Sequence, residues 1–237
     1  TLFRSLISDE FSKEKYGLEK IKYGDSTVFK MLFLYNIALT ETEDLETFFP
    51  FYRFYETKSW NIEHILAKND DGLDSFEEFN NFYLDIQNLI NVSTDEDINQ
   101  ENKSIILELL KELMLLITEN KKGDCKKKIK EINDKIVEFF NVDDFNNLCL
   151  LDQSTNIKVG KKPFRRKRDI ILELDEEIKI DADAYISIGT KNVFLKKSTN
   201  SSAFQIDYWS IRDRELYLKM VKSTITNFLK LEQDESN

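Results

Sequence analysis

The chain has a single histidine, His64, among its 237 residues, and only two cysteines, Cys125 and Cys149. One histidine excludes histidine-rich zinc sites and the two-histidine protease motif, and two cysteines on separate predicted elements do not favour a structural zinc site. So few cysteines also exclude the disulfide framework of small secreted proteins. A reducing compartment, the cytoplasm, is therefore the expected location.

Long apolar runs are also missing. The longest, around residues 31–34 and 114–117, fall far short of the roughly 20 residues that a membrane-spanning helix needs. No basic start followed by an apolar core and a cleavage site precedes Phe3, so no signal peptide is expected. With 41% hydrophobic and 33% charged residues, two prolines and six glycines, the composition is typical of a folded soluble protein of one or two domains without a membrane partner.

Positive charge is concentrated in one place. The net charge of the chain is −10, which taken alone argues against nucleic acid as a partner. Residues 158–168 (KVGKKPFRRKR) nevertheless contain seven basic residues and no acidic one. Such a run on an acidic chain is a candidate anion-binding surface, although an exposed, solvated segment is the ordinary alternative.

Helical patterns dominate the chain. Residues 26–39 have dense apolar positions after a Ser/Thr start and predict a buried helix. Apolar residues recur at spacings of three and four between residues 75 and 140, which predicts two helices joined by the acidic loop 94–101 and a third at 124–140 with Asp124 as its cap. These stripes indicate the core of a helical bundle rather than a cofactor site.

The C-terminal half carries further predicted elements. Pro163 suits the first position of a helix that runs to about residue 174, and another helix is expected over residues 211–231. Residues 184–194 (AYISIGTKNVF) look like a strand. The aromatic segment at 48–55 (FFPFYRFY) predicts an extended stretch packed into the core, because a helix does not readily cross Pro50.

Two short strands are predicted near the histidine and the basic run. Residues 60–66 (WNIEHIL) alternate polar and apolar, which sends Glu63 and His64 to opposite faces, and residues 147–151 (NLCLL) form an apolar strand. Residues 152–155 (DQST) then offer capping side chains for a turn of helix that holds Asn156. The expected class is α+β, mainly helical.

This order of strand, strand and helical turn resembles the His-Asn-His (ββα-metal) nucleases. The resemblance implies that the strands at 60–66 and 147–151 pair antiparallel although 80 residues separate them. The acidic-His-Ile sequence at residues 63–65 and the spacing of nine between Asn147 and Asn156 are similar to the nuclease domain of CRISPR effector enzymes. The alternative is a structural role, since a lone histidine beside a carboxylate is usually a satisfied structural residue. A Ser/His/Asp triad has little support, because no Gly-x-Ser-x-Gly is present.

A longer resemblance covers residues from about 28 to 229. The segments FFPFYRFYETKSWNIEHI, NNLCLLDQSTNIKVGKKPFRRKRDII, YISIGTKNVFLK and YWSIRDRELYL occur in the order found in the C-terminal half of GmrSD-type, modification-dependent (type IV) restriction endonucleases. Those proteins join an N-terminal ParB-like nucleotide-hydrolysing domain to a helical region with a His-Asn-His nuclease. The resemblance implies that this chain is part of a longer protein and that its partners are DNA and such a nucleotide-hydrolysing domain.

The resemblance also implies roles for individual residues. His64 corresponds to the general base, and Asn147 to a residue of the catalytic site that braces the strand and orients the histidine. Glu63 and Asn156 correspond to ligands of Mg²⁺ or Mn²⁺, which would require a bend or bulge in the strand to bring Glu63 and His64 to one site. The residues that would bind the DNA backbone are Lys158, Lys161, Lys162, Arg165, Lys167 and Arg168.

The expected architecture is a small ββα-metal nuclease unit embedded in a helical domain. It divides into an N-terminal helical region at 1–59, a nuclease region at 60–174 with a helical insertion at about 70–141, and a C-terminal strand-helix region at 175–237 that packs on the rest. The expected function is a metal-dependent DNA endonuclease module of a restriction or anti-phage defence protein. A catalytically inactive helical interaction or regulatory module and an RNA-directed nuclease are the alternatives.

Overall fold

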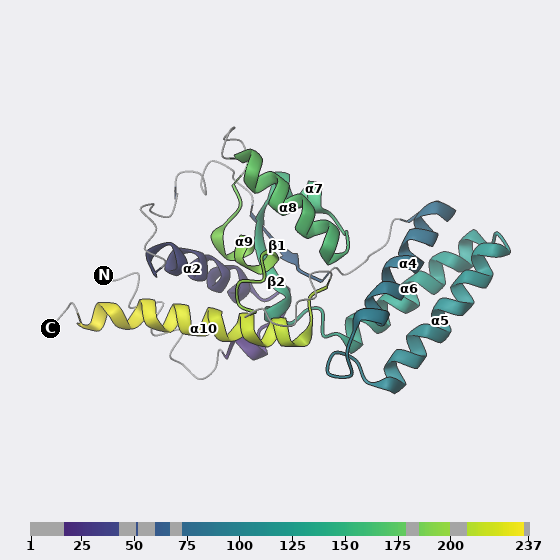
Figure 1. Ribbon diagram of the computed structural model, residues 1–237, viewed down its shortest axis with the longest axis horizontal. Helices are drawn as coiled ribbons and strands as arrows, with labels where there is room; N and C mark the ends of the chain where they lie inside the picture. Colours follow the sequence, from purple (N-terminus) through teal and green to yellow (C-terminus); the bar gives the residue numbers. More distant parts are fainter. Residues whose placement is uncertain are drawn as a thin grey trace.

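The structure, a computed structural model, describes residues 17–42, 51, 60–66, 73–178, 185–199 and 208–234. Over these ranges the protein is mainly helical and has one two-stranded antiparallel sheet, in agreement with the predicted α+β class (Figure 1). No helix in these ranges is both long enough and apolar enough to span a membrane.

The elements follow one another in a simple order. The strands are β1 (Trp60–His64) and β2 (Leu148–Asp152). The helices are η2 (Leu18–Lys20), α2 (Ser26–Thr42), α4 (Phe76–Val92), α5 (Gln100–Thr118), α6 (Lys122–Phe139), η3 (Phe145–Asn147), α7 (Gln153–Val159), α8 (Phe164–Ile178), α9 (Ile188–Phe194) and α10 (Ile211–Asp234).

The helices α4, α5 and α6 lie side by side at one end of the molecule and form a bundle (Figure 1). Ser75 and Glu78 begin α4 with a reciprocal capping box, in which Ser75 N donates to Glu78 Oε2 at 2.9 Å and Glu78 N donates to Ser75 Oγ at 3.2 Å. The three helices predicted between residues 75 and 140 are confirmed. The predicted cap is wrong, because α6 begins at Lys122 and Asp124 lies within its first turn. There the Asp124 carboxylate interacts favourably with the positive end of the helix dipole.

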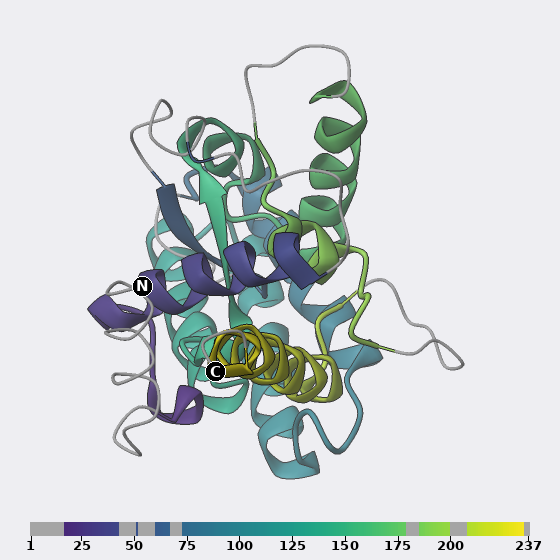
Figure 2. The same cartoon turned by 90° about the vertical axis from the view of Figure 1, so that its left-hand side faces the viewer.

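The two strands pair antiparallel, although the three helices of the bundle separate them in the sequence. Trp60 lies opposite Asp152 and His64 lies opposite Leu148, which confirms the pairing that the sequence predicts. Every residue of β2 is buried, because α2 and α9 both contact it. Figure 2 shows α2 crossing in front of the sheet.

The C-terminal helix α10 packs along α2 and reaches the sheet. Tyr217, on α10, donates its hydroxyl to Leu148 O at 3.2 Å, and its ring lies 6.0 Å from that of Tyr35 on α2. Trp209, which is fully buried just before α10, donates its indole N–H to Asn146 O at 3.1 Å. Side chains from both ends of the described chain thus enclose β2.

One predicted strand is a helix. The strand-like segment 184–194 contains α9, whose residues 189, 190, 192, 193 and 194 are all buried. So short a run fits the period of a strand or of a helix, which explains the error. Gly189 permits this packing, since a Cβ there would come within 2.7 Å of Asn36 Oδ1, the acceptor of the Gly189 N–H at 2.7 Å.

The remaining predictions differ in their bounds. Pro163 directly precedes α8 and accepts a hydrogen bond from Lys167 N at 3.0 Å, so it is the cap and not the first helical residue. The helix continues to Ile178, and α10 continues to Asp234. The aromatic segment 48–55 lies outside the described residues except for Phe51.

Candidate active site

The candidate site lies where β1, β2 and α7 meet. The chain passes from β2 into α7 without a loop, because Asp152 ends the strand and caps the helix: its Oδ1 accepts from Ser154 N at 2.9 Å and from Thr155 N at 3.0 Å. This turn places Asn156 on α7, beside both strands. The order of strand, strand and helix is the one that the sequence predicts.

His64 ends β1 and is nearly enclosed, with 11% of its side chain exposed. Its Nε2 lies 2.9 Å from Asp143 Oδ1, and its ring centroid lies 4.4 Å from that of Tyr23. Burial lowers the pKa of His64 below its ordinary value of 6.5, although the neighbouring Asp143 carboxylate opposes this shift. The imidazole is thus neutral at pH 7. When Nε2–H donates to Asp143, the lone pair remains on Nδ1.

Asp143 is a site residue that the sequence prediction missed. It is brought to the histidine by a contact between two loops, in which Tyr23 N donates to Asp143 O at 2.7 Å and Lys22 pairs with Asp144 as an isolated β-bridge. The acidic pair that precedes Asn147 by a few residues was the one available signal. Tyr23 and Asp143 together set the position of the imidazole ring.

Asn147 is fully buried and holds the chain directly after His64. Its Oδ1 accepts from Leu66 N at 2.8 Å, and its Nδ2 donates to Leu66 O at 3.1 Å and to Val142 O at 2.7 Å. Its own carbonyl accepts from Ile65 N at 2.8 Å. The structure therefore gives Asn147 the bracing contacts that the resemblance implies. Its place in a catalytic reaction stays a prediction.

Glu63 lies on the other face of the strand from His64. The register is continuous, with Glu63 opposite Cys149 and His64 opposite Leu148, so the bulge that would bring both to one site is not present in β1. The Glu63 carboxylate is ion-paired with Lys167 Nζ, which also donates to His64 O at 2.6 Å. A carboxylate that binds an ammonium group is already charge-compensated, so its role as a metal ligand stays a prediction.

Asn156 offers an oxygen that suits a hard metal ion. Its Oδ1 is buried and has no hydrogen-bond partner in the described part of the chain, and the same holds for Asp152 Oδ2 and Thr155 Oγ1. Mg²⁺ and Mn²⁺ prefer such oxygen donors and keep several of their own water ligands. The residues on α7 therefore fit a divalent ion. Among the described residues no three His, Cys, Asp or Glu side chains converge as a ligand group, so protein carboxylates alone do not make the site.

The basic run divides into exposed and buried members. Lys158, Lys161, Lys162 and Arg165 are exposed around the junction of α7 and α8. Lys167, expected to contact phosphate, is instead fully buried, and Arg168 Nε donates to Phe194 O at 3.0 Å. The reason is helical periodicity, because position 167 falls on the inward face of α8 together with the buried residues 164, 171 and 174.

Both cysteines are buried and free. Burial raises the pKa of the Cys149 thiol to about 12 and also raises that of Cys125. Both thiols are therefore protonated at neutral pH, and neither presents the thiolate that a zinc ion binds.

Comparison with known proteins adds no assignment, since no family model, curated protein or solved structure matches the chain. The chemistry of the site must be judged from its geometry. His64, held by Asp143, ends β1 at one end of the ladder, opposite Leu148. Asp152, from which α7 and Asn156 follow, lies at the other end, opposite Trp60. Exposed cations of the basic run lie on α7 and directly after it.

Proposed function

We propose that this chain is a metal-dependent DNA endonuclease module that hydrolyses phosphodiester bonds. The observation that carries the proposal is the neutral His64 at the end of β1, fixed by Asp143, in a strand-strand-helix unit whose helix presents the buried oxygen of Asn156. The resemblance to GmrSD-type enzymes supports a place in a modification-dependent restriction or anti-phage defence protein. Its partners would be DNA and a ParB-like nucleotide-hydrolysing domain.

His64 would act as the general base. Its Nδ1 accepts a proton from the attacking water, and the Asp143 carboxylate at Nε2 stabilises the imidazolium that forms. Asn147 fixes the backbone on the far side of His64, which keeps the ring from shifting as it takes up charge. Asn156, with Glu63 if Lys167 releases it, would hold Mg²⁺ or Mn²⁺, and the bound ion would neutralise charge on the scissile phosphate.

Plasmid cleavage in the presence of Mg²⁺ or Mn²⁺ tests the proposal. His64→Ala should lower the rate by about 10²- to 10⁴-fold, the usual contribution of a general base, with little loss of DNA binding. Asn156→Ala should instead raise the metal concentration that cleavage needs, so that added Mn²⁺ restores part of the activity. Glu77→Ala, an exposed change on α4, is the matched control. Equal cleavage by wild type and His64→Ala would show that the assigned site is wrong.

A catalytically inactive helical interaction or regulatory module is the second candidate. The observation that favours it is the ion pair of Glu63 with the buried Lys167, which leaves one fewer carboxylate for a metal. The two candidates differ in metal binding, which isothermal titration with Mn²⁺ measures directly. If the chain is an inactive module, either Mn²⁺ does not bind or Asn156→Ala leaves its binding unchanged. The full-length protein should then cleave no DNA with any divalent ion.

A further inference from the structure

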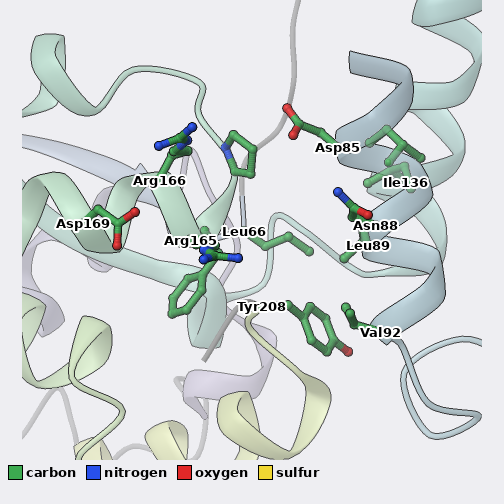
Figure 3. A pocket seen from close by; sticks show the side chains of 13 residues that line it. Leu66, Asp85, Asn88, Leu89, Val92, Ile136, Arg165, Arg166, Asp169 and Tyr208 are labelled. Carbon is green, nitrogen blue, oxygen red and sulfur yellow. The ribbon is translucent and has the colours of Figure 1, made fainter. Parts of the chain in front are cut away.

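A cleft of about 600 Å³ lies between α4 of the helical bundle and the start of α8 (Figure 3). Leu66 lines it, two residues beyond His64. Because Asn147 binds both backbone groups of Leu66, the cleft wall is rigidly connected to the end of β1. Leu66 therefore connects the cleft to the end of β1.

The lining has three chemically different parts. Leu66, Leu89 and Val92 form an apolar wall, next to which the ring of Tyr208 lies (Figure 3). Asp85 and Asn88 stand on the α4 side and offer hydrogen-bond acceptors and donors, one helical turn apart. The α8 side carries two adjacent arginines, Arg165 and Arg166, and the carboxylate of Asp169.

Those arginines give the α8 side of the cleft two positive charges against the one negative charge of Asp169. Arg165 and Arg166 are exposed and lie in the first turn of α8, where the backbone N–H groups precede the first helical bond, from Lys167 N to Pro163 O. Asp85 is the acidic group that faces Arg166 across the cleft, and burial raises the pKa of Asp85 against the pull of that arginine. Lys158, Lys161 and Lys162 of the basic run precede α8, so positive charge continues from the cleft to the junction with α7.

We propose that this cleft binds one unpaired nucleotide of a nucleic acid strand. The phosphate would lie at Arg165 and Arg166, the face of the base on the apolar wall, and the edge of the base toward Asp85 and Asn88. The volume lies within the range of about 300–1,000 Å³ that small-molecule pockets have, which suits a single nucleotide. The proposal rests on the proposed function, because the strand bound here is the one that the site at His64 would cut.

Binding of a short fluorescent oligothymidine, measured by anisotropy in EDTA so that nothing is cut, tests the charged side of the cleft. Arg166→Gln should weaken binding about tenfold, as expected for loss of a close arginine contact. Lys111→Gln removes the same charge from an exposed position on α5 outside the cleft and should change binding by no more than about twofold. Equal losses in the two variants would overturn the proposal, since they would reduce it to general attraction of phosphate.

A second variant tests the apolar side without a change of charge. Val92 is exposed where it borders the cleft, so Val92→Trp can fill the space without entering the core. It should weaken binding of the single strand and leave binding of the same strand annealed to its complement unchanged. Leu115→Trp, at an exposed position on α5 away from the cleft, is the control and should change neither. Thymidine monophosphate should raise the unfolding midpoint of wild type more than that of Val92→Trp.

The outcomes separate this proposal from the proposed function. A wild-type protein that binds oligothymidine through the cleft but cuts no plasmid would keep the nucleotide site and overturn the nuclease. A protein that cuts plasmid while Val92→Trp binds oligothymidine as wild type does would overturn the nucleotide site alone. Failure of the wild type to bind oligothymidine would also overturn the proposed nucleotide site.

Discussion

Asn147 and Leu66 are joined by two hydrogen bonds, from Leu66 N to Asn147 Oδ1 at 2.8 Å and from Asn147 Nδ2 to Leu66 O at 3.1 Å. The Asn147 side-chain amide takes the place of a peptide group in the ladder, because it both donates a hydrogen bond to Leu66 and accepts one from it. The β1–β2 ladder is thereby continued past His64, although the strand itself ends there.

Asn147→Ala should destabilise the protein strongly. The change leaves Leu66 N, Leu66 O and Val142 O without their partner inside the protein, and each buried unsatisfied group costs about 1–3 kcal/mol. We expect the free energy of unfolding in urea to fall by about 3 kcal/mol, since partial relaxation reduces the sum. Asn91→Ala, on the exposed face of α4, should stay within about 0.5 kcal/mol of wild type. A similar small effect at Asn147 would mean that water replaces its amide.

The ion pair of Lys167 and Glu63 should show strong coupling. Lys167→Met leaves a carboxylate that is 17% exposed without its ammonium partner, and it also removes the donor to His64 O. Breaking such a pair should cost about 3 kcal/mol of unfolding free energy. Adding Glu63→Gln should recover part of that loss, which a double-mutant cycle measures. Lys158→Met, at an exposed position, should change the free energy of unfolding little. If the effects of Lys167→Met and Glu63→Gln on that free energy were additive, the two side chains would not be paired.

Asp143→Asn should change the pH dependence of cleavage. The Asp143 carboxylate raises the pKa of His64 against the larger lowering by burial, so its removal lowers that pKa further. The acidic limb of the rate profile should therefore move to lower pH. The rate at neutral pH should fall by about 10²-fold, because the imidazolium loses its stabilising partner. An unshifted acidic limb would show that His64 is not the titrating base.

His64 should also make the fold sensitive to acid. Its pKa in the folded protein lies below the unfolded value of about 6.5, so below that pH the unfolded chain binds more protons than the folded one. The contribution of His64 to stability is thus constant above about pH 6.5 and falls as the pH drops from there to the folded pKa. Urea midpoints across this interval should fall less steeply for His64→Gln than for wild type. Parallel curves would contradict the lowered pKa.

Duplex binding should depend on the exposed part of the basic run. Lys158→Ala combined with Lys161→Ala should weaken binding of all sequences alike and lower the salt dependence by about one unit for each phosphate that the protein no longer neutralises. Lys111→Ala, an exposed lysine on α5, should alter neither quantity. Unchanged affinity in the double variant would mean that the run is a solvated surface.

The elements that could be predicted from the sequence are those whose pattern is local. The alternation in 60–66 and the apolar run before Asp152 predict two strands. Their pairing could be expected only from the resemblance, because the bundle separates them in the sequence. The role of Asn147 could be expected only from the resemblance, and the structure places this residue in η3, directly before the second strand.

What the sequence could not reveal depends on contacts between distant segments. Asp143 reaches His64 from 79 positions away, because the loop around Tyr23 holds it there. Lys167 looks like its basic neighbours in the sequence, and only the orientation of α8 turns it inward to Glu63. The sequence predicts a strand in place of α9, because seven residues are too few for the pattern to distinguish a helix from a strand.

The pairing of β1 with β2 across the bundle has a consequence for how the protein folds. Contacts within α4, α5 and α6 are local and form rapidly, whereas the ladder between His64 and Leu148 closes a long loop and forms slowly. Folding of the bundle shortens that loop by bringing its ends together. Tyr217 on α10 then covers Leu148. We expect amide protons of the bundle to become protected from exchange first and those of the two strands last, so that the candidate site is complete only when α10 has docked.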